Sequence, residues 1–175
     1  MSGEVYFHPY DGALVDINDR VNTAKSAGRF CFEVANLEFT VEKALLNLTT
    51  MTNEWDGTKA FFTPGKWVCF SKSGETIILH LRARSRQLEV DRKGVAILFE
   101  DRSMLESNQT EIITDTKEEG GYFGYSASMG LSEEDEQHFL TKKMIRYRLN
   151  HVEDSVSETF ARLIPFYISA LKQKP

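Results

Sequence analysis

Hydrophobic and polar residues alternate with a period of two through the middle of the chain. Within residues 76–84, Leu79 and Leu81 alternate with His80 and Arg82. This alternation predicts a strand with one buried face. Four further strands of similar character are predicted at residues 59–63, 66–71, 87–91 and 95–99. Short connections that contain glycine separate most of these segments, which favours antiparallel pairing. We therefore predict an antiparallel meander over about residues 59–99.

Helical spacing of apolar residues replaces this alternation before the meander. In residues 39–55, Leu45 and Leu48 belong to one apolar stripe, which predicts an early helix. The Thr residues near its end are weak helix formers. The segments predicted ahead of this helix are a strand at residues 5–10, a short helix at residues 18–27 and a strand at residues 30–34.

The last third of the chain has the same helical spacing. Two apolar stripes follow capping-box patterns that begin at Ser132 and Ser155. We predict two consecutive C-terminal helices, and we expect Pro165 to bend or break the second one because proline lacks an amide donor. Between meander and helices, residues 100–130 are rich in acids, Ser, Thr and Gly, and we expect a flexible segment there.

These elements predict an α+β fold with a central antiparallel sheet. One early helix and two C-terminal helices are expected to pack on it, within a single domain over residues 1–175. The chain is 41% hydrophobic with a net charge of −5, which excludes a disordered chain. No secretory signal pattern and no apolar run of bilayer length are visible. We therefore expect a cytoplasmic protein with no membrane contact.

Catalytic and metal-binding motifs are not recognisable in the sequence. The four histidines are far apart, and both Cys31 and Cys69 lie in apolar strand-like segments, which indicates buried, unreactive thiols. We assign no catalytic residue, no metal site and no cofactor. His80, Arg82 and Arg84 fall on one face of a predicted strand, and a histidine beside arginines suits phosphodiester chemistry.

The uneven distribution of charge suggests a different kind of site. The chain is basic at residues 82–93, but seven acids and two bases lie between Glu100 and Glu119, and four consecutive acids begin at Glu133. Aromatic residues lie between the two acidic stretches. An acidic surface bordered by aromatics is suited to docking a basic protein. The residues predicted to bind this partner are Glu118, Glu119, Tyr122, Phe123, Tyr125, Glu133, Glu134, Asp135 and Glu136.

The sequence therefore leads to three functional hypotheses. The first is a non-enzymatic cytoplasmic inhibitor, such as an immunity protein or antitoxin, that neutralises a basic protein partner, for example a toxin nuclease. It requires no direct contact with nucleic acid. The alternative is a small enzyme that processes a phosphodiester or nucleotide with His80, Arg82 and Arg84. The third is an adaptor that oligomerises through its C-terminal helices.

Overall fold

One long antiparallel sheet dominates the structure. In the computed structural model, the described residues are 5–7, 14–16 and 39–175. In chain order they form β1 (Val5–Phe7), β2 (Leu14–Asp16), α2 (Val41–Leu46), β3 (Thr49–Thr52), β4 (Lys59–Phe62), β5 (Val68–Ser73), β6 (Thr76–Ser85), β7 (Arg92–Phe99), β8 (Met104–Glu119), β9 (Tyr122–Gly130), α3 (Glu133–Thr141), β10 (Met144–Leu149), β11 (Val152–Ser155) and α4 (Glu158–Lys172). β1 and β2 pair with each other.

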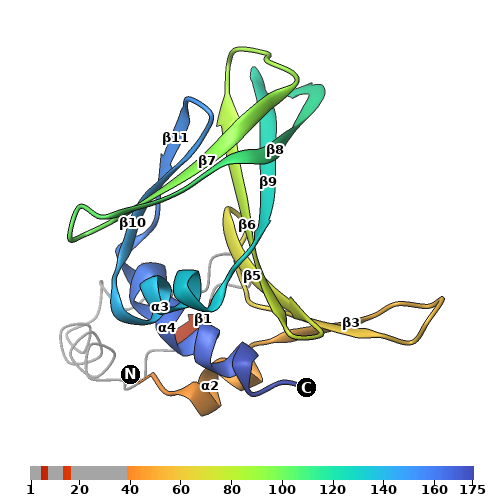
Figure 1. Ribbon diagram of the computed structural model, residues 1–175, viewed down its shortest axis with the longest axis vertical. Coiled ribbons are helices and arrows are strands. Elements are labelled where there is room, and N and C mark those ends of the chain that lie inside the picture. Colours follow the sequence, from red (N-terminus) through yellow and green to blue (C-terminus); the bar gives the residue numbers. More distant parts are fainter. Residues whose placement is uncertain (1–4, 8–13, 17–38) are drawn as a thin grey trace.

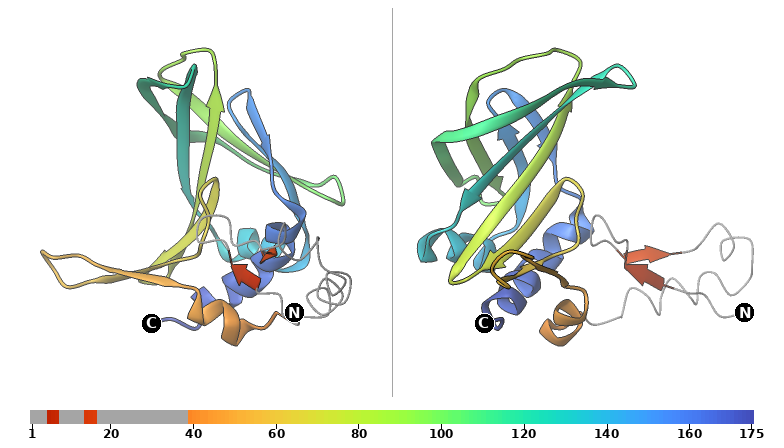
Figure 2. Two further views of the ribbon diagram at one scale, coloured as in Figure 1. Left: turned by 180° about the vertical axis from the view of Figure 1, so that it is seen from behind. Right: turned by 90° about the vertical axis from the view of Figure 1, so that its right-hand side faces the viewer.

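The other nine strands form a single sheet in the order β11-β10-β7-β8-β9-β6-β5-β4-β3. The sheet curls (Figure 1), and β11 contacts β6 across the curl. The hairpin of β3 and β4 extends away from the curled part (Figure 2). With an early helix, two C-terminal helices and an antiparallel sheet, the predicted α+β fold is confirmed. Among the described helices, none combines the length and apolar character needed to cross a bilayer.

The core lies between the inner face of the curled sheet and α4. Phe70, Phe99 and Phe139 pack edge to face at centroid distances of 5.3 and 5.4 Å. α4 begins where the Ser157 side chain accepts a hydrogen bond from the Phe160 amide. The residues of α4 that are buried are Phe160, Ala161, Leu163, Ile164, Tyr167, Ile168, Ala170 and Leu171. This face of α4 is covered within the chain.

Pro165 lies inside α4 without ending it. The expected break is therefore absent. A proline inside a helix removes one hydrogen bond and costs about 3 kcal/mol. Burial of a large apolar side chain stabilises by about 1.5–3 kcal/mol, and α4 buries several on both sides of Pro165. Packing of the whole helix thus outweighs the local cost.

The early helix is much shorter than predicted. It covers only Val41–Leu46, and the chain then forms the edge strand Thr49–Thr52. Three of the four residues in this strand are Thr, a β-branched residue that is restricted in helices and favoured in strands. The end of the predicted helix was therefore wrong, and the Thr residues were the signal for it.

Residues 144–155 are also strand where a helix was predicted. Met144–Leu149 and Val152–Ser155 pair as β10 and β11. Tyr147 and Leu149 are buried while Arg146 and Arg148 are not, which is the period of a strand. In the sequence, the single Arg148 between Tyr147 and Leu149 was the signal for a strand, and the helix prediction did not take it into account.

The acidic and glycine-rich segment is not a loop. It forms β8 and β9, which pair with each other in the middle of the sheet. Few apolar residues mark β8, since only Leu105 and Ile112 of it are buried.

Residues 87–91, predicted as strand, lie outside any strand. The predicted strand at residues 5–10 is present as Val5–Phe7, whereas the predictions for residues 18–27 and 30–34 fall outside the described residues.

Candidate functional site

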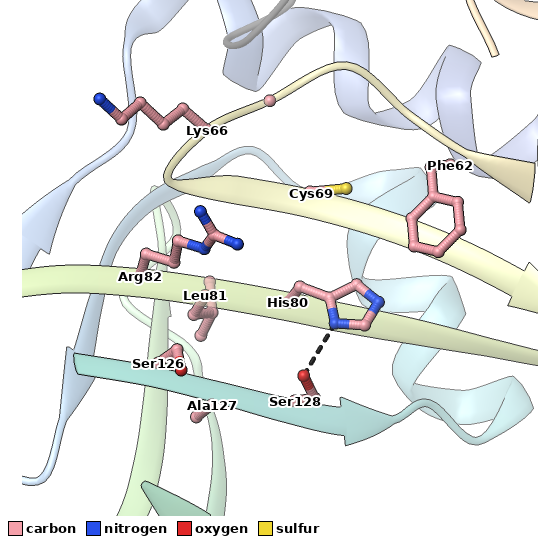
Figure 3. A pocket seen from close by; sticks show the side chains of 10 residues that line it. Phe62, Lys66, Cys69, His80, Leu81, Arg82, Ser126, Ala127 and Ser128 are labelled. Atoms are coloured by element: carbon pink, nitrogen blue, oxygen red, sulfur yellow. Dashed lines mark hydrogen bonds between the residues drawn. The ribbon is translucent and has the colours of Figure 1, made fainter. Parts of the chain in front are cut away.

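His80, Arg82 and Arg84 lie on one face of β6, as the strand period predicts. This outer face points away from the core, because the intervening Leu81 and Ala83 are buried. His80 and Arg82 line a pocket of about 650 Å³, which Figure 3 shows from close by. We call it the His80 pocket.

The neighbouring strands supply the other walls of the His80 pocket. β9 pairs with β6 so that Ser128 is opposite His80 and Ser126 is opposite Arg82. On the other side, β5 places Cys69 opposite His80. The turn between β4 and β5 contains Gly65, whose φ of 141° favours glycine. This turn adds Lys66 to the lining, and the end of β4 adds Phe62.

Two serine hydroxyls hold the His80 ring. Ser71 Oγ lies 2.7 Å from Nε2, and Ser128 Oγ lies 2.8 Å from Nδ1. A neutral imidazole has one donor and one acceptor nitrogen. Ser71 is only 3% exposed, and a buried hydroxyl needs an acceptor for its proton. We therefore infer that Ser71 donates to Nε2 and that Nδ1–H donates to Ser128, whose own proton points to other partners.

The surroundings of His80 favour its neutral form. Burial lowers the pKa of His80 below its ordinary value of 6.5, and the charge of Arg82 lowers this pKa further. The Phe62 ring stacks on the imidazole at a centroid distance of 6.1 Å. Neutral His80 is consistent with the hydrogen bonds to Ser71 and Ser128, because only a neutral ring accepts at Nε2.

Cys69 lies in the same pocket but has the properties of an unreactive thiol. Burial raises the pKa of Cys69. Its Sγ lies 3.3 Å from the Thr63 carbonyl oxygen, to which the thiol donates. A thiol is nucleophilic as the thiolate, and these surroundings favour the protonated form. Cys31 lies outside the described residues.

Lys66 and Arg82 line the pocket, and Arg84 lines the neighbouring hollow on the same face of β6. Among the described residues, no carboxylate forms an ion pair with Lys66, Arg82 or Arg84. Arg84 and Lys66 instead lie over the Trp67 ring, at 4.7 and 5.2 Å from its centroid. A second hollow of about 410 Å³ shares Lys66 and Arg82 with the His80 pocket and also includes Asp115.

The residues predicted to form one acidic docking surface lie in two separate places. Glu118, Glu119 and Tyr122 are at the tip of the β8–β9 hairpin, whereas α3 begins after the other end of β9. β9 has nine residues, so the two places are roughly 26 Å apart. The fold does not bring them together.

Several of these residues have roles inside the fold. Ser132 and Asp135 form a capping box at the start of α3, and Glu136, 6% exposed, pairs with Lys172 at 2.6 Å. Tyr125 is buried, where its hydroxyl accepts from the Glu89 amide at 2.9 Å. Phe123 is partly buried against the core. The predicted residues that remain exposed are Glu118, Glu119, Tyr122, Glu133 and Glu134.

The pocket contains residues that the sequence did not single out. Lys66, Ser126 and Ser128 line it from segments other than β6, and the buried Ser71 of β5 contacts the His80 ring without lining the pocket. Alternation along one strand identifies residues that share its face, but it gives no register with a strand more than forty residues away. The Ser-Ala-Ser sequence at residues 126–128 has a strand period and was the available signal.

No other cluster in the described part of the chain suggests a metal centre, since no three His, Cys, Asp or Glu side chains converge there. Comparison of the chain with protein-family models, curated proteins and solved structures finds no match.

Proposed function

We propose that this protein binds a small phosphate-bearing molecule in the His80 pocket. The observation that carries this proposal is the presence of two cations, Arg82 and Lys66, in one pocket of the outer face, neither of which pairs with a described carboxylate. Arginine binds phosphate through two parallel hydrogen bonds, and lysine adds a point charge. A phosphate group between them would supply the negative charge that the described carboxylates do not.

The hydrogen bonds of His80 support the same ligand. In the direction inferred above, Ser71 donates to His80, and His80 donates to Ser128. The proton of the exposed Ser128 hydroxyl is then free for the ligand. Arg82 and Ser128 offer donors to the pocket, and Lys66 adds a positive charge at its rim. An ionised phosphate has only acceptors to offer in return.

The pocket also suits the organic part of such a ligand. Its volume of about 650 Å³ is within the range of small-molecule sites, about 300–1,000 Å³. Phe62 and Leu81 add apolar surface to the lining. We therefore propose an organic phosphate ester rather than inorganic phosphate as the preferred ligand.

Binding is favoured over the phosphodiester or nucleotide processing that the residues of β6 suggested. A general base must accept a proton from the attacking group. In the inferred tautomer, Nδ1 of His80 is already protonated where it meets Ser128, and Nε2 is occupied by Ser71. This arrangement supports a hydrogen-bond donor at Ser128 and gives no reason to assign His80 as a base.

The test is calorimetric titration with phenyl phosphate, with phenol as the uncharged comparison. We expect saturable binding of phenyl phosphate and none of phenol. Arg82→Ala removes a charged hydrogen bond worth about 1.5–3 kcal/mol, so its affinity should fall by about 10- to 150-fold. Arg148→Ala is the matched control, because Arg148 is exposed on β10, away from the pocket. Equal affinity in both variants, or no binding to wild type, contradicts the proposal.

A second candidate function is the cytoplasmic inhibitor of a basic protein, such as an immunity protein. Glu118 and Glu119 are exposed beside Tyr122 at the hairpin tip, which supports a smaller acidic and aromatic surface than the sequence suggested. Arg86 lies over the Tyr122 ring at 5.3 Å from its centroid. The contact supports a fixed orientation of that ring, which reduces the entropy lost on docking.

Affinity purification followed by mass spectrometry tests this candidate. It predicts that a basic protein is retained in stoichiometric amount. Reversal of charge at Glu118 and Glu119 should release that protein, whereas reversal at Glu133 and Glu134 serves as the control at the distant acidic site. Retention of the partner by both variants contradicts a role for the hairpin tip.

A further inference from the structure

One edge of the sheet lacks the features that normally prevent strand pairing. β11, at one edge, has four residues that include Glu153 and Asp154. β3, at the other edge, is Thr-Thr-Met-Thr, uncharged and exposed at all four positions. Natural edge strands are usually protected by charges, prolines, bulges or a covering segment. Within residues 5–7, 14–16 and 39–175, no segment pairs with the outer side of β3, which belongs to a hairpin that extends away from the rest of the sheet (Figure 1).

The free groups can be assigned to particular residues. The Asn53 amide donates to the Thr58 carbonyl oxygen at 2.8 Å, so Asn53 faces β4. Hydrogen-bonding direction alternates along an antiparallel strand. Thr49 and Met51 therefore also face β4, and the N–H and C=O groups of Thr50 and Thr52 point outward.

The outward N–H and C=O groups of Thr50 and Thr52 can all form hydrogen bonds in one symmetric pairing of two β3 strands. Two antiparallel copies of β3 satisfy every outward group when Thr50 of each copy is opposite Thr52 of the other. Met51 then lies on the two-fold axis, opposite its own copy. Such a contact is isologous and closes after two chains.

The same register brings together the largest exposed apolar side chains of this region. Trp55 is 97% exposed, Leu46 is 85% exposed and Met51 is 59% exposed. Leu46 precedes β3 and Trp55 follows it. Antiparallel pairing therefore brings the end of one copy that carries Trp55 towards the end of the other that carries Leu46.

We propose that β3 is a homodimer interface, in which two copies of the chain pair antiparallel about Met51 and form one continuous sheet. This inference is independent of ligand binding, because Arg82 and His80 take no part in it. The dimer would present two His80 pockets on one continuous sheet.

Oxidative cross-linking tests the register directly. The residues on the axis form a non-hydrogen-bonded pair with Cα atoms about 4.5 Å apart, which a disulfide spans. Met51→Cys should therefore form a disulfide between two copies, identified by mass spectrometry as a peptide linked to itself. Thr49→Cys is the matched control. Its Cα would be roughly 14 Å from its counterpart, so it should remain unlinked.

Analytical ultracentrifugation of the unmodified chain completes the test. We expect a mass of twice 20.0 kDa that falls to the monomer on dilution. Trp55→Ser and Thr50→Pro should shift the equilibrium to monomer, with unchanged circular dichroism as the check on folding. A wild-type chain that remains monomeric at its highest soluble concentration overturns the proposal. A dimer unaffected by both substitutions, or equal cross-linking at positions 49 and 51, also overturns it.

Discussion

The Tyr147 hydroxyl donates a hydrogen bond to the backbone carbonyl oxygen of Arg82. Tyr147 is on β10 and Arg82 is on β6, and three strands separate them in the sheet. The Arg82 amide donates to the Trp67 carbonyl oxygen at 2.8 Å, and the Tyr147 hydroxyl supplies the donor for the Arg82 carbonyl oxygen. The bond thereby joins the two sides of the curl at the residue whose side chain enters the His80 pocket.

Loss of this hydrogen bond should reduce stability and ligand affinity together. Tyr147→Phe leaves the Arg82 carbonyl without its donor, at a cost of about 1–3 kcal/mol in the free energy of unfolding. The backbone of Arg82 is then less firmly held, so phenyl phosphate should bind more weakly. Urea denaturation and calorimetric titration measure the two effects.

Tyr167→Phe is the matched comparison. Tyr167 is fully buried, and its hydroxyl lies near the Asn47 side chain but makes no hydrogen bond of normal geometry among the described residues. Burial raises the pKa of Tyr167 to about 12. Removal of an unpaired buried hydroxyl relieves a desolvation cost, so this variant should be as stable as wild type or about 1 kcal/mol more stable. Similar losses from both Tyr→Phe changes would show that the Tyr147 bond has no special role.

The two serines that contact His80 should behave differently when replaced. Ser71 is buried and donates to the ring, so Ser71→Ala should lower the free energy of unfolding by about 1 kcal/mol. Ser128 is exposed, and Ser128→Ala should leave stability unchanged while phenyl phosphate affinity falls by about 2- to 10-fold. Nitrogen NMR of the His80 ring should find the proton on Nδ1. A proton on Nε2 would reverse the inferred direction and remove the support that His80 gives to Ser128 as a donor.

His80 should make the protein less stable in acid. Its folded-state pKa lies below the ordinary 6.5 because of burial and, secondarily, Arg82. The unfolded chain therefore takes up this proton first as pH falls. The stability that neutral His80 contributes is complete above 6.5 and is lost as pH falls from there through the folded-state pKa.

Denaturant titrations of wild type and His80→Gln between about pH 5 and pH 8 isolate this effect from the other histidines. Wild type should lose more stability than the variant as pH falls. Parallel pH profiles for the two proteins would show that His80 is not held neutral by the fold.

The acids at the start of α3 should divide into structural and dispensable residues. Asp135→Asn weakens the capping box, and Glu136→Gln weakens the ion pair between the buried Glu136 and the partly exposed Lys172. Each should lower the free energy of unfolding, by about 1 kcal/mol for the cap and by at least as much for the pair, because the Glu136 carboxylate is buried. Glu133→Gln and Glu134→Gln should stay within about 0.5 kcal/mol of wild type. Thermal melts of the four variants provide the comparison, and uniform effects would contradict this division.

The sequence predicted the face of β6 correctly because alternation within one strand is a local property. His80, Arg82 and Arg84 share the outer face as expected. The serines around His80 depend instead on pairing between β6 and strands β5 and β9, and local pattern carries no information on that register. Only the pocket residues on β6 could therefore be predicted from the sequence.

The largest errors in secondary structure have the same origin. Met144–Leu149 has enough apolar residues to resemble one face of a helix, but it forms a strand because it pairs with β7. β8 is polar on most of its length, yet pairing on both sides with β7 and β9 satisfies its backbone. Tertiary pairing, rather than local preference, determines both segments.

The central claim, that the pocket around Arg82 binds a phosphate group, is tested most directly by a two-dimensional NMR titration with phenyl phosphate. The Arg82 side-chain Nε–H signal and the amides of Lys66, Ser126 and Ser128 should shift together and saturate, while Arg148 stays unchanged. No saturable shift at Arg82, or shifts that gather elsewhere on the molecule, would contradict the claim.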